Sequence, residues 1–145
     1  MSLAELKKSG RIREIPVDKK QIENLVAVAK RDLGVAESLL KENSDWCYIA
    51  CYNSMLQISR ALMYCYGYTT ENEAHHKTVV EFAGEVLGKE GEASAIALDR
   101  MRRKRHDVVY DEAGAISAYE AKNALEAAKN YFTMMEGRIM RKISP

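Results

Sequence analysis

The sequence has few of the residues that mark secreted, metal-bound or disulfide-linked domains. Its 145 residues include only two prolines, three cysteines, two phenylalanines and one tryptophan. Cys47 and Cys51 lie four positions apart in an apolar stretch and Cys65 stands alone, so there is no CxxC pair and no histidine at zinc spacing. We therefore expect reduced thiols in the core, with no disulfide framework, no metal site and no cofactor.

The chain also lacks an excess of charge of one sign and a long uninterrupted apolar run. Its 22 basic residues nearly balance its 21 acidic residues, and the first residues contain no apolar core typical of a secretory signal. The most apolar stretch, residues 46–66, is interrupted by Asn53, Gln57 and Arg60, which argues against a membrane span. We expect a cytoplasmic protein that does not contact a membrane and is large enough to bury one core.

Apolar residues recur at helical spacing along almost the whole chain, whereas strand-like alternation is absent. They follow steps of three and four between Asp18 and Glu42, and again over residues 121–139 after a capping-box pair, Ser117 and Glu120. Shorter helices are predicted over 75–87 and 92–110. The pattern predicts an all-α fold, an antiparallel bundle of about five main helices over residues 18–143, preceded by a short helix and an extended arm over residues 1–17.

The predicted helix over residues 44–66 is apolar on almost every side, which indicates a buried central helix. Asn53, Gln57 and Arg60 follow one another at i, i+4 and i+7, so they form one narrow polar stripe. A buried stripe needs partners. It either makes hydrogen bonds and an ion pair within the bundle, or it lines an interface or a phosphate-binding cleft.

Five cations occur within six residues near the end of the 92–110 helix, immediately before a histidine. They are Arg100, Arg102, Arg103, Lys104 and Arg105. A solvated helix face is one interpretation. The other is phosphodiester chemistry, because guanidinium groups bind phosphate bidentately, and an imidazole or a phenol can move the proton of a ribose 2′-hydroxyl.

These residues supply the candidate site. Arg105, His106 and Tyr110 are the candidate catalytic residues, and the remaining four cations, Arg100, Arg102, Arg103 and Lys104, are candidates for binding RNA or phosphate. His75 and His76 open the 75–87 helix, but adjacent side chains on a helix diverge and only one further histidine exists. We therefore expect them to cap the helix or to contact a neighbouring helix rather than to bind a metal.

Several separated segments agree in order and spacing with one family of small helical proteins. The segments are Lys30–Leu40, Cys51–Leu62, Gly67, His76-Lys77 and Arg100–Tyr110. In these features the chain resembles the HEPN superfamily, over roughly residues 20 to 140. The resemblance implies a helical bundle. It also implies one of two activities, since the superfamily includes metal-independent endoribonucleases, many of them toxins encoded beside a nucleotidyltransferase, and inactive members that only bind.

In active members an arginine is followed by a polar residue and then, roughly four to six positions on, by a histidine. Starting the motif at Arg105, the polar residue is His106 and the histidine position holds Tyr110, which resembles the tyrosine-bearing branch of the superfamily. Starting at Arg100, His106 lies at a fitting distance, but Met101 is not polar. The first alignment is preferred.

Two functional hypotheses follow from the resemblance and the basic segment. In the first, the protein is a non-catalytic HEPN-like module that binds RNA or a nucleotide, or partners a nucleotidyltransferase in a toxin–antitoxin-type system. In the second, it is a metal-independent endoribonuclease that leaves a 2′,3′-cyclic phosphate. A homodimer is expected in both, because a two-fold axis near the basic helix would let two patches share one cleft.

Overall fold

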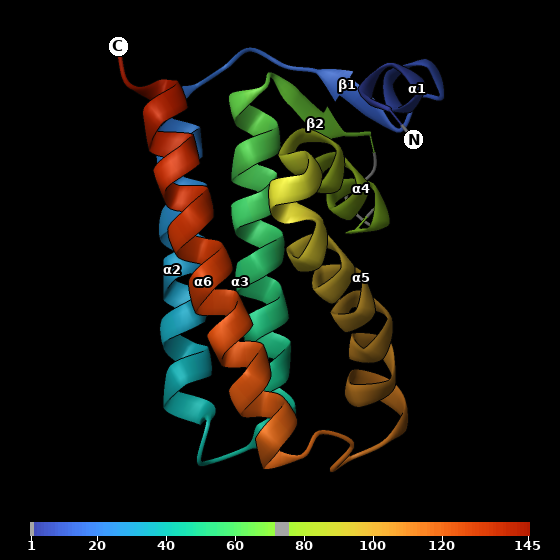
Figure 1. The fold of residues 1–145 in the computed structure, drawn as a ribbon, viewed down its shortest axis with the longest axis vertical. Coiled ribbons are helices and arrows are strands. Elements are labelled where there is room, and N and C mark those ends of the chain that lie inside the picture. Colours follow the sequence, from blue (N-terminus) through green and yellow to red (C-terminus); the bar gives the residue numbers. More distant parts are fainter. Residues whose placement is uncertain (1, 72–75) are drawn as a thin grey trace.

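Three long helices and a shorter helical hairpin make up the fold in the computed structural model, which describes residues 2–71 and 76–145 (Figure 1). The long helices are α2 (Lys19–Leu39), α3 (Ser44–Cys65) and α6 (Ala118–Ile143), and the hairpin consists of α4 (His76–Leu87) and α5 (Glu92–His106). A short helix, α1 (Leu3–Lys8), precedes them. The predicted all-α bundle of five main helices is thus confirmed.

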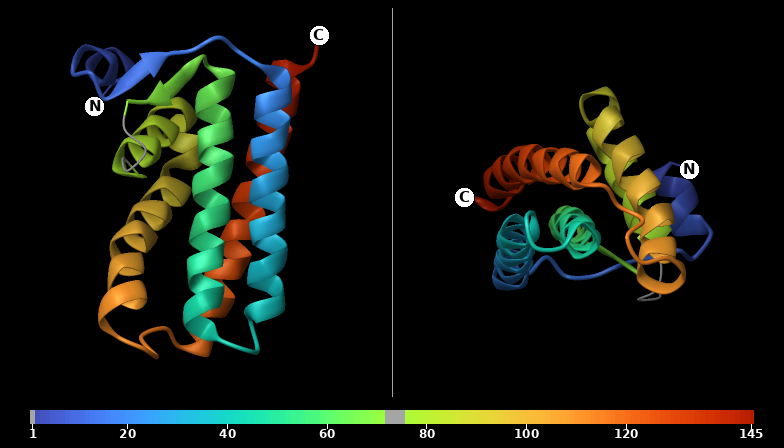
Figure 2. Two further views of the ribbon diagram at one scale, coloured as in Figure 1. Left: turned by 180° about the vertical axis from the view of Figure 1, so that it is seen from behind. Right: turned by 90° about the horizontal axis from the view of Figure 1, so that it is seen from below.

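Helix α3 is the central element of the bundle. It contacts α2 and α6 on one side and α4 and α5 on the other (Figures 1 and 2). Fifteen of its 22 residues are buried, as expected for a helix that is apolar on almost every side. Its buried hydroxyls have partners: Ser54 Oγ donates to the Ala29 carbonyl at 2.7 Å, and Ser59 Oγ lies 2.6 Å from the Tyr131 hydroxyl.

The predicted helix starts are present in the structure. The Asp18 carboxylate accepts the Gln21 N–H at 3.3 Å, and Ser117 Oγ accepts the Glu120 N–H at 3.0 Å. These bonds satisfy N–H groups that have no partner within the first turn of a helix. The Glu120 carboxylate accepts instead from Lys104 Nζ at 2.6 Å, so it ties α6 to α5.

Two short strands depart from the sequence expectation. β1 (Ile12–Glu14), within the predicted extended arm, pairs antiparallel with β2 (Tyr68–Thr70), which lies between the helices predicted over 44–66 and 75–87. Three-residue strands are too short to show alternation, and their pairing joins segments far apart in the chain. Gly67, with φ of 78°, makes the turn from α3 into β2, a conformation that glycine adopts without strain. Leu6 and Ile12 are buried, so the N-terminal segment belongs to the same core.

The end of the hairpin also differs from the prediction of one helix over 92–110. Helix α5 stops at His106 and the chain continues as a π-helical turn, η2 (Asp107–Asp111), in which the Glu112 N–H donates to the Asp107 carbonyl at 3.0 Å. Such a turn widens the helix, so the angles of an ideal α-helix no longer relate residues across it. The predicted start of α4 at His75 lies outside the described residues.

The three cysteines are buried and free.

No helix within residues 2–71 and 76–145 combines the length and the apolar character needed to cross a membrane.

Candidate functional site

The α4–α5 hairpin brings the beginning of one helix beside the end of the next. The two helices pack against each other and are joined by a 3₁₀ turn, η1 (Gly88–Gly91), whose first residue has a positive φ of 59°. Because the helices run in opposite directions, the first residues of α4 lie at the same end of the hairpin as the basic segment of α5.

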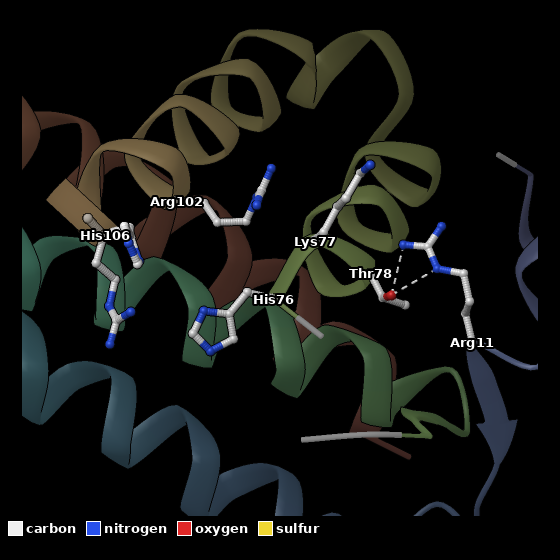
Figure 3. A pocket seen from close by; sticks show the side chains of 7 residues that line it. Arg11, His76, Lys77, Thr78, Arg102 and His106 are labelled. Carbon is white, nitrogen blue, oxygen red and sulfur yellow. Dashed lines mark hydrogen bonds between the residues drawn. The ribbon is translucent and has the colours of Figure 1, made fainter. Parts of the chain in front are cut away.

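A pocket of about 690 Å³ lies at this end of the hairpin, and we call it the basic pocket (Figure 3). It is lined by Arg11, His76, Lys77, Thr78, Arg102, Arg105 and His106. Figure 3 shows Arg102 and His106 of α5 on one side, and Lys77, Thr78 and Arg11 on the other, with His76 between them. None of the described lining residues is acidic, so their charges favour an anionic ligand.

The cations of the basic pocket differ in how far they are neutralised. The Arg11 guanidinium donates to Glu81 at 2.9 Å and to Thr78 at 2.8 Å, and Arg102 donates to Asp99 at 3.0 Å. Lys77 and Arg105 form no ion pair with any acid in the described part of the chain.

Arg105 also has an unsatisfied donor. Its Nε is buried and has no hydrogen-bond partner among the described residues. Leaving a buried donor unsatisfied costs about 1–3 kcal/mol, and its guanidinium carbon lies 6.0 Å from the centre of the Tyr52 ring. A phosphate bound by the terminal nitrogens of this guanidinium would supply the missing negative charge.

A buried tyrosine holds the imidazole of His76. The Tyr52 hydroxyl and His76 Nδ1 are 2.9 Å apart, and Tyr52 is fully buried on α3. Burial raises the pKa of the Tyr52 phenol, so its hydroxyl stays protonated at neutral pH. Because Nδ1 is engaged in this contact, Nε2 is the ring nitrogen that remains for a ligand.

The surroundings of His76 disfavour its charged form. Partial burial lowers its pKa below 6.5, and the positive charges of Arg105, Arg102 and Arg60 lower it further. The neutral imidazole is therefore the favoured form at pH 7. An anion bound among these arginines would cancel part of their repulsion and raise the pKa of His76.

We expect an NMR titration to give His76 a pKa below 6.5, and Arg105→Ala to raise it because one repelling charge is removed.

Because the folded-state pKa is depressed, the unfolded chain takes up the proton first. The contribution of the His76 imidazole to the free energy of unfolding is therefore fully present above about pH 6.5, and it is lost as the pH falls through the folded-state pKa. His76→Gln should remove that part of the pH dependence. A His76 pKa at or above 6.5 would contradict this assignment.

The structure brings together three of the residues singled out from the sequence: Arg102, Arg105 and His106 all line the basic pocket. Tyr110 does not line it. Its side chain is 69% exposed and packs against His106, with the ring centroids 5.2 Å apart, and it lines a different pocket beside Trp46. Tyr110 lies within the π-helical turn that follows His106.

The other candidate cations lie away from the basic pocket. Arg100 lines a separate pocket between α5 and α6, Arg103 pairs with Asp99 at 3.5 Å, and Lys104 pairs with Glu120 at 2.6 Å. A run of five cations on a helix must point in several directions, because successive residues are about 100° apart.

The three residues of the polar stripe on α3 also lie in different surroundings. Gln57 and Arg60 line a second pocket, and Asn53 is half-buried. The hydrogen bond from Arg60 to Gln57 at 2.8 Å shows that the stripe is partly satisfied within itself.

Sequence reasoning did not assign Arg11, Tyr52 or Lys77 to the site. It predicted for His76 only a capping role or a contact with a neighbouring helix, and the contact with Tyr52 on α3 is of the second kind. Arg11 lies 67 positions from its partner Thr78, and no local pattern reveals such a contact. A signal did exist for His76 and Lys77, because this pair is one of the segments that resemble the HEPN superfamily. Within the described residues no cluster of three or more histidine, cysteine or acidic side chains is arranged to hold a metal.

Comparison with protein families agrees with this architecture. The family model of the HEPN domain matches residues 22–138, which is more than half of the chain, and the protein therefore belongs to the HEPN domain family. The resemblance found from the sequence is confirmed. A search of curated proteins and a search of solved structures returned no significant match.

Proposed function

We propose that the protein binds RNA or a nucleotide through phosphate groups held in the basic pocket. The observation that carries the proposal is the convergence of Lys77, Arg102 and Arg105 in a pocket with no acid among its described lining residues, together with the lack of a described acidic partner for Lys77 and Arg105. Guanidinium groups bind phosphate oxygens with charge-assisted hydrogen bonds, and the two imidazoles add further donors.

The direct test is a titration of the purified protein into a fluorescently labelled single-stranded RNA of about 12 nucleotides, read by anisotropy at several salt concentrations. We expect affinity to fall as salt rises, because bound phosphates release counterions. Inorganic phosphate and AMP serve as competitors in separate arms. Absence of binding to all three ligands at low salt would refute the proposal.

Metal-independent RNA cleavage is a second candidate function, favoured by the two imidazoles, His76 and His106, in the same pocket. In this reaction the ribose 2′-oxygen attacks the adjacent phosphorus while a neutral imidazole takes its proton. The bond from phosphorus to the 5′-oxygen then breaks, and that oxygen receives a proton, which leaves a 2′,3′-cyclic phosphate and a 5′-hydroxyl. Arg102 and Arg105 would stabilise the additional negative charge.

If the pocket cleaves RNA, incubation of mixed RNA in EDTA should yield fragments that end in 2′,3′-cyclic phosphate. His106→Ala and His76→Ala, tested separately, should identify the working base, since losing it lowers the rate by roughly 100-fold or more. Tyr110 contacts His106 but does not line the basic pocket, so Tyr110→His, which rebuilds the motif histidine of the preferred alignment, should raise or create cleavage only if the bound RNA also reaches this side chain. Intact RNA with the wild type and with Tyr110→His would leave binding as the function. The homodimer and the nucleotidyltransferase partner stay predictions from the resemblance.

A further inference from the structure

A second pocket of about 590 Å³ adjoins the basic pocket, and His76 lines both. The second pocket lies between α3 and β2 and is lined mainly by polar side chains, among them Arg13, Gln57, Arg60 and Tyr64. Because His76 borders both cavities, a ligand that occupied both would contact this side chain.

Arg60 is held in a fixed position in this second pocket. Its guanidinium donates to Gln57 Oε1 at 2.8 Å and to the Tyr64 hydroxyl at 3.1 Å, and its central carbon lies 5.8 Å from the centre of the Tyr64 ring. These contacts occupy two of the five N–H donors of a guanidinium. A side chain already held in place loses less conformational freedom when it binds a ligand.

The charge of Arg60 is not neutralised. Both of its hydrogen-bond partners are neutral, and it forms no ion pair with a described acid. The acid that lines the same pocket, Glu71, pairs instead with Arg13 at 3.6 Å on the exposed rim. Of the described lining residues, Arg60 is thus the cation left for an anionic ligand.

Arg60 also lies close enough to His76 to act on it electrostatically. Its positive charge lowers the pKa of His76, as do those of Arg105 and Arg102 in the basic pocket. Cations from both pockets therefore surround one neutral imidazole. This arrangement suits two anionic groups separated by a short uncharged segment, which is the pattern of consecutive phosphates and ribose along a nucleic-acid strand.

We propose that Arg60 forms a second phosphate subsite, so that the ligand is a single RNA strand whose consecutive phosphates lie on either side of His76. This inference rests on the proposed phosphate binding in the basic pocket and selects an oligonucleotide over a mononucleotide. The strand is single because unpaired nucleotides can follow a groove between side chains, with the phosphates in the groove and the bases free to stack.

The test compares ligands with one and with two phosphates. Affinities for AMP, ADP and the 5′-phosphorylated dinucleotide pApA are measured for the wild type, Arg60→Gln and Arg105→Gln. We expect Arg60→Gln to weaken pApA binding by roughly tenfold, as for the loss of one charge-assisted contact, and to leave AMP binding within about twofold. Arg105→Gln should weaken the binding of both. For a longer single-stranded RNA, Arg60→Gln should reduce the salt slope by about 0.7.

Two controls separate a ligand contact from a structural effect. Arg31→Gln removes a charge from α2, which lies on the other side of α3 from the α4–α5 hairpin (Figure 2), and should change no affinity. Arg60→Lys keeps the charge but loses the planar fork, so it should retain part of the affinity for pApA. Thermal unfolding of each variant checks that it is folded.

The outcomes distinguish this inference from the proposed function. Equal losses for AMP and pApA with Arg60→Gln, or no loss for either, would overturn the second subsite. A loss for ADP as large as the loss for pApA would assign Arg60 to a nucleoside diphosphate and overturn the strand. If Arg105→Gln also leaves every affinity unchanged, the phosphate site in the basic pocket itself is refuted.

Discussion

RNA affinity is expected to fall by roughly 100-fold at low salt when Arg102 and Arg105 are both replaced by alanine. Each guanidinium can form charge-assisted hydrogen bonds to phosphate, and such bonds contribute about 1.5–3 kcal/mol. Arg105 should account for the larger share, because Arg102 already donates to Asp99 whereas Arg105 has no acidic partner among the described residues. The measurement is RNA affinity as a function of salt.

The salt dependence gives a second readout of the same variant. Each phosphate contact on a single strand contributes about 0.7 to the slope of log affinity against log salt, so losing two contacts should flatten it by about 1.4. The control variant combines Arg31→Ala with Arg141→Ala and so removes two positive charges from exposed positions outside the basic pocket. It should leave the RNA affinity and its salt slope nearly unchanged. An unchanged slope in the Arg102/Arg105 variant would mean that these arginines form only a solvated face.

Leu62→Ala should lower the free energy of unfolding by about 2–5 kcal/mol. Leu62 is fully buried on α3, the helix that α2, α4, α5 and α6 all contact. Removing most of its side chain leaves a cavity that the surrounding helices cannot all close, and this cost adds to the lost burial of apolar surface. Chemical denaturation measured by circular dichroism gives the difference directly.

Ile96→Ala is the matched control for that substitution. Ile96 is also a four-carbon aliphatic residue on a helix, but its side chain is 60% exposed. Its replacement should change stability by less than about 0.5 kcal/mol. A loss below 1 kcal/mol for Leu62→Ala would contradict the central position of α3.

The helices could be predicted because their information is local. Asp18 and Ser117 mark helix starts by side-chain contacts that span only three residues, and the apolar stripes repeat within a few turns. The small sheet could not be predicted, since Ile12 pairs with Thr70 and only the folded chain brings them together. The π-helical turn after His106 shifts the register of one helix by a local change that apolar periodicity does not encode.

The candidate site was predictable only in part for a related reason. Arg102, Arg105 and His106 stand out as a cluster in sequence, and they do share a pocket. Tyr52, on the other hand, looks like any apolar residue of a central helix, although its hydroxyl fixes the imidazole of His76. Arg103 and Lys104 belong to the same cluster but have acidic partners away from the pocket. Arg103 pairs with Asp99 on its own helix, whereas the partner of Lys104 is Glu120 on α6, so the direction of Lys104 depends on where α6 packs.

The unpartnered Nε of Arg105 has a practical consequence for how the protein should be handled. Like-charged groups gathered around a cavity lower the stability of the folded state, and a small multivalent anion bound there would relieve the repulsion. If the basic pocket binds phosphate as proposed, phosphate and sulfate buffers will act as weak ligands that stabilise the fold by mass action and compete with nucleic acid. Phosphate or sulfate buffers chosen to keep the protein folded would therefore lower its measured affinity for RNA. Affinities should instead be compared in chloride buffers of matched ionic strength.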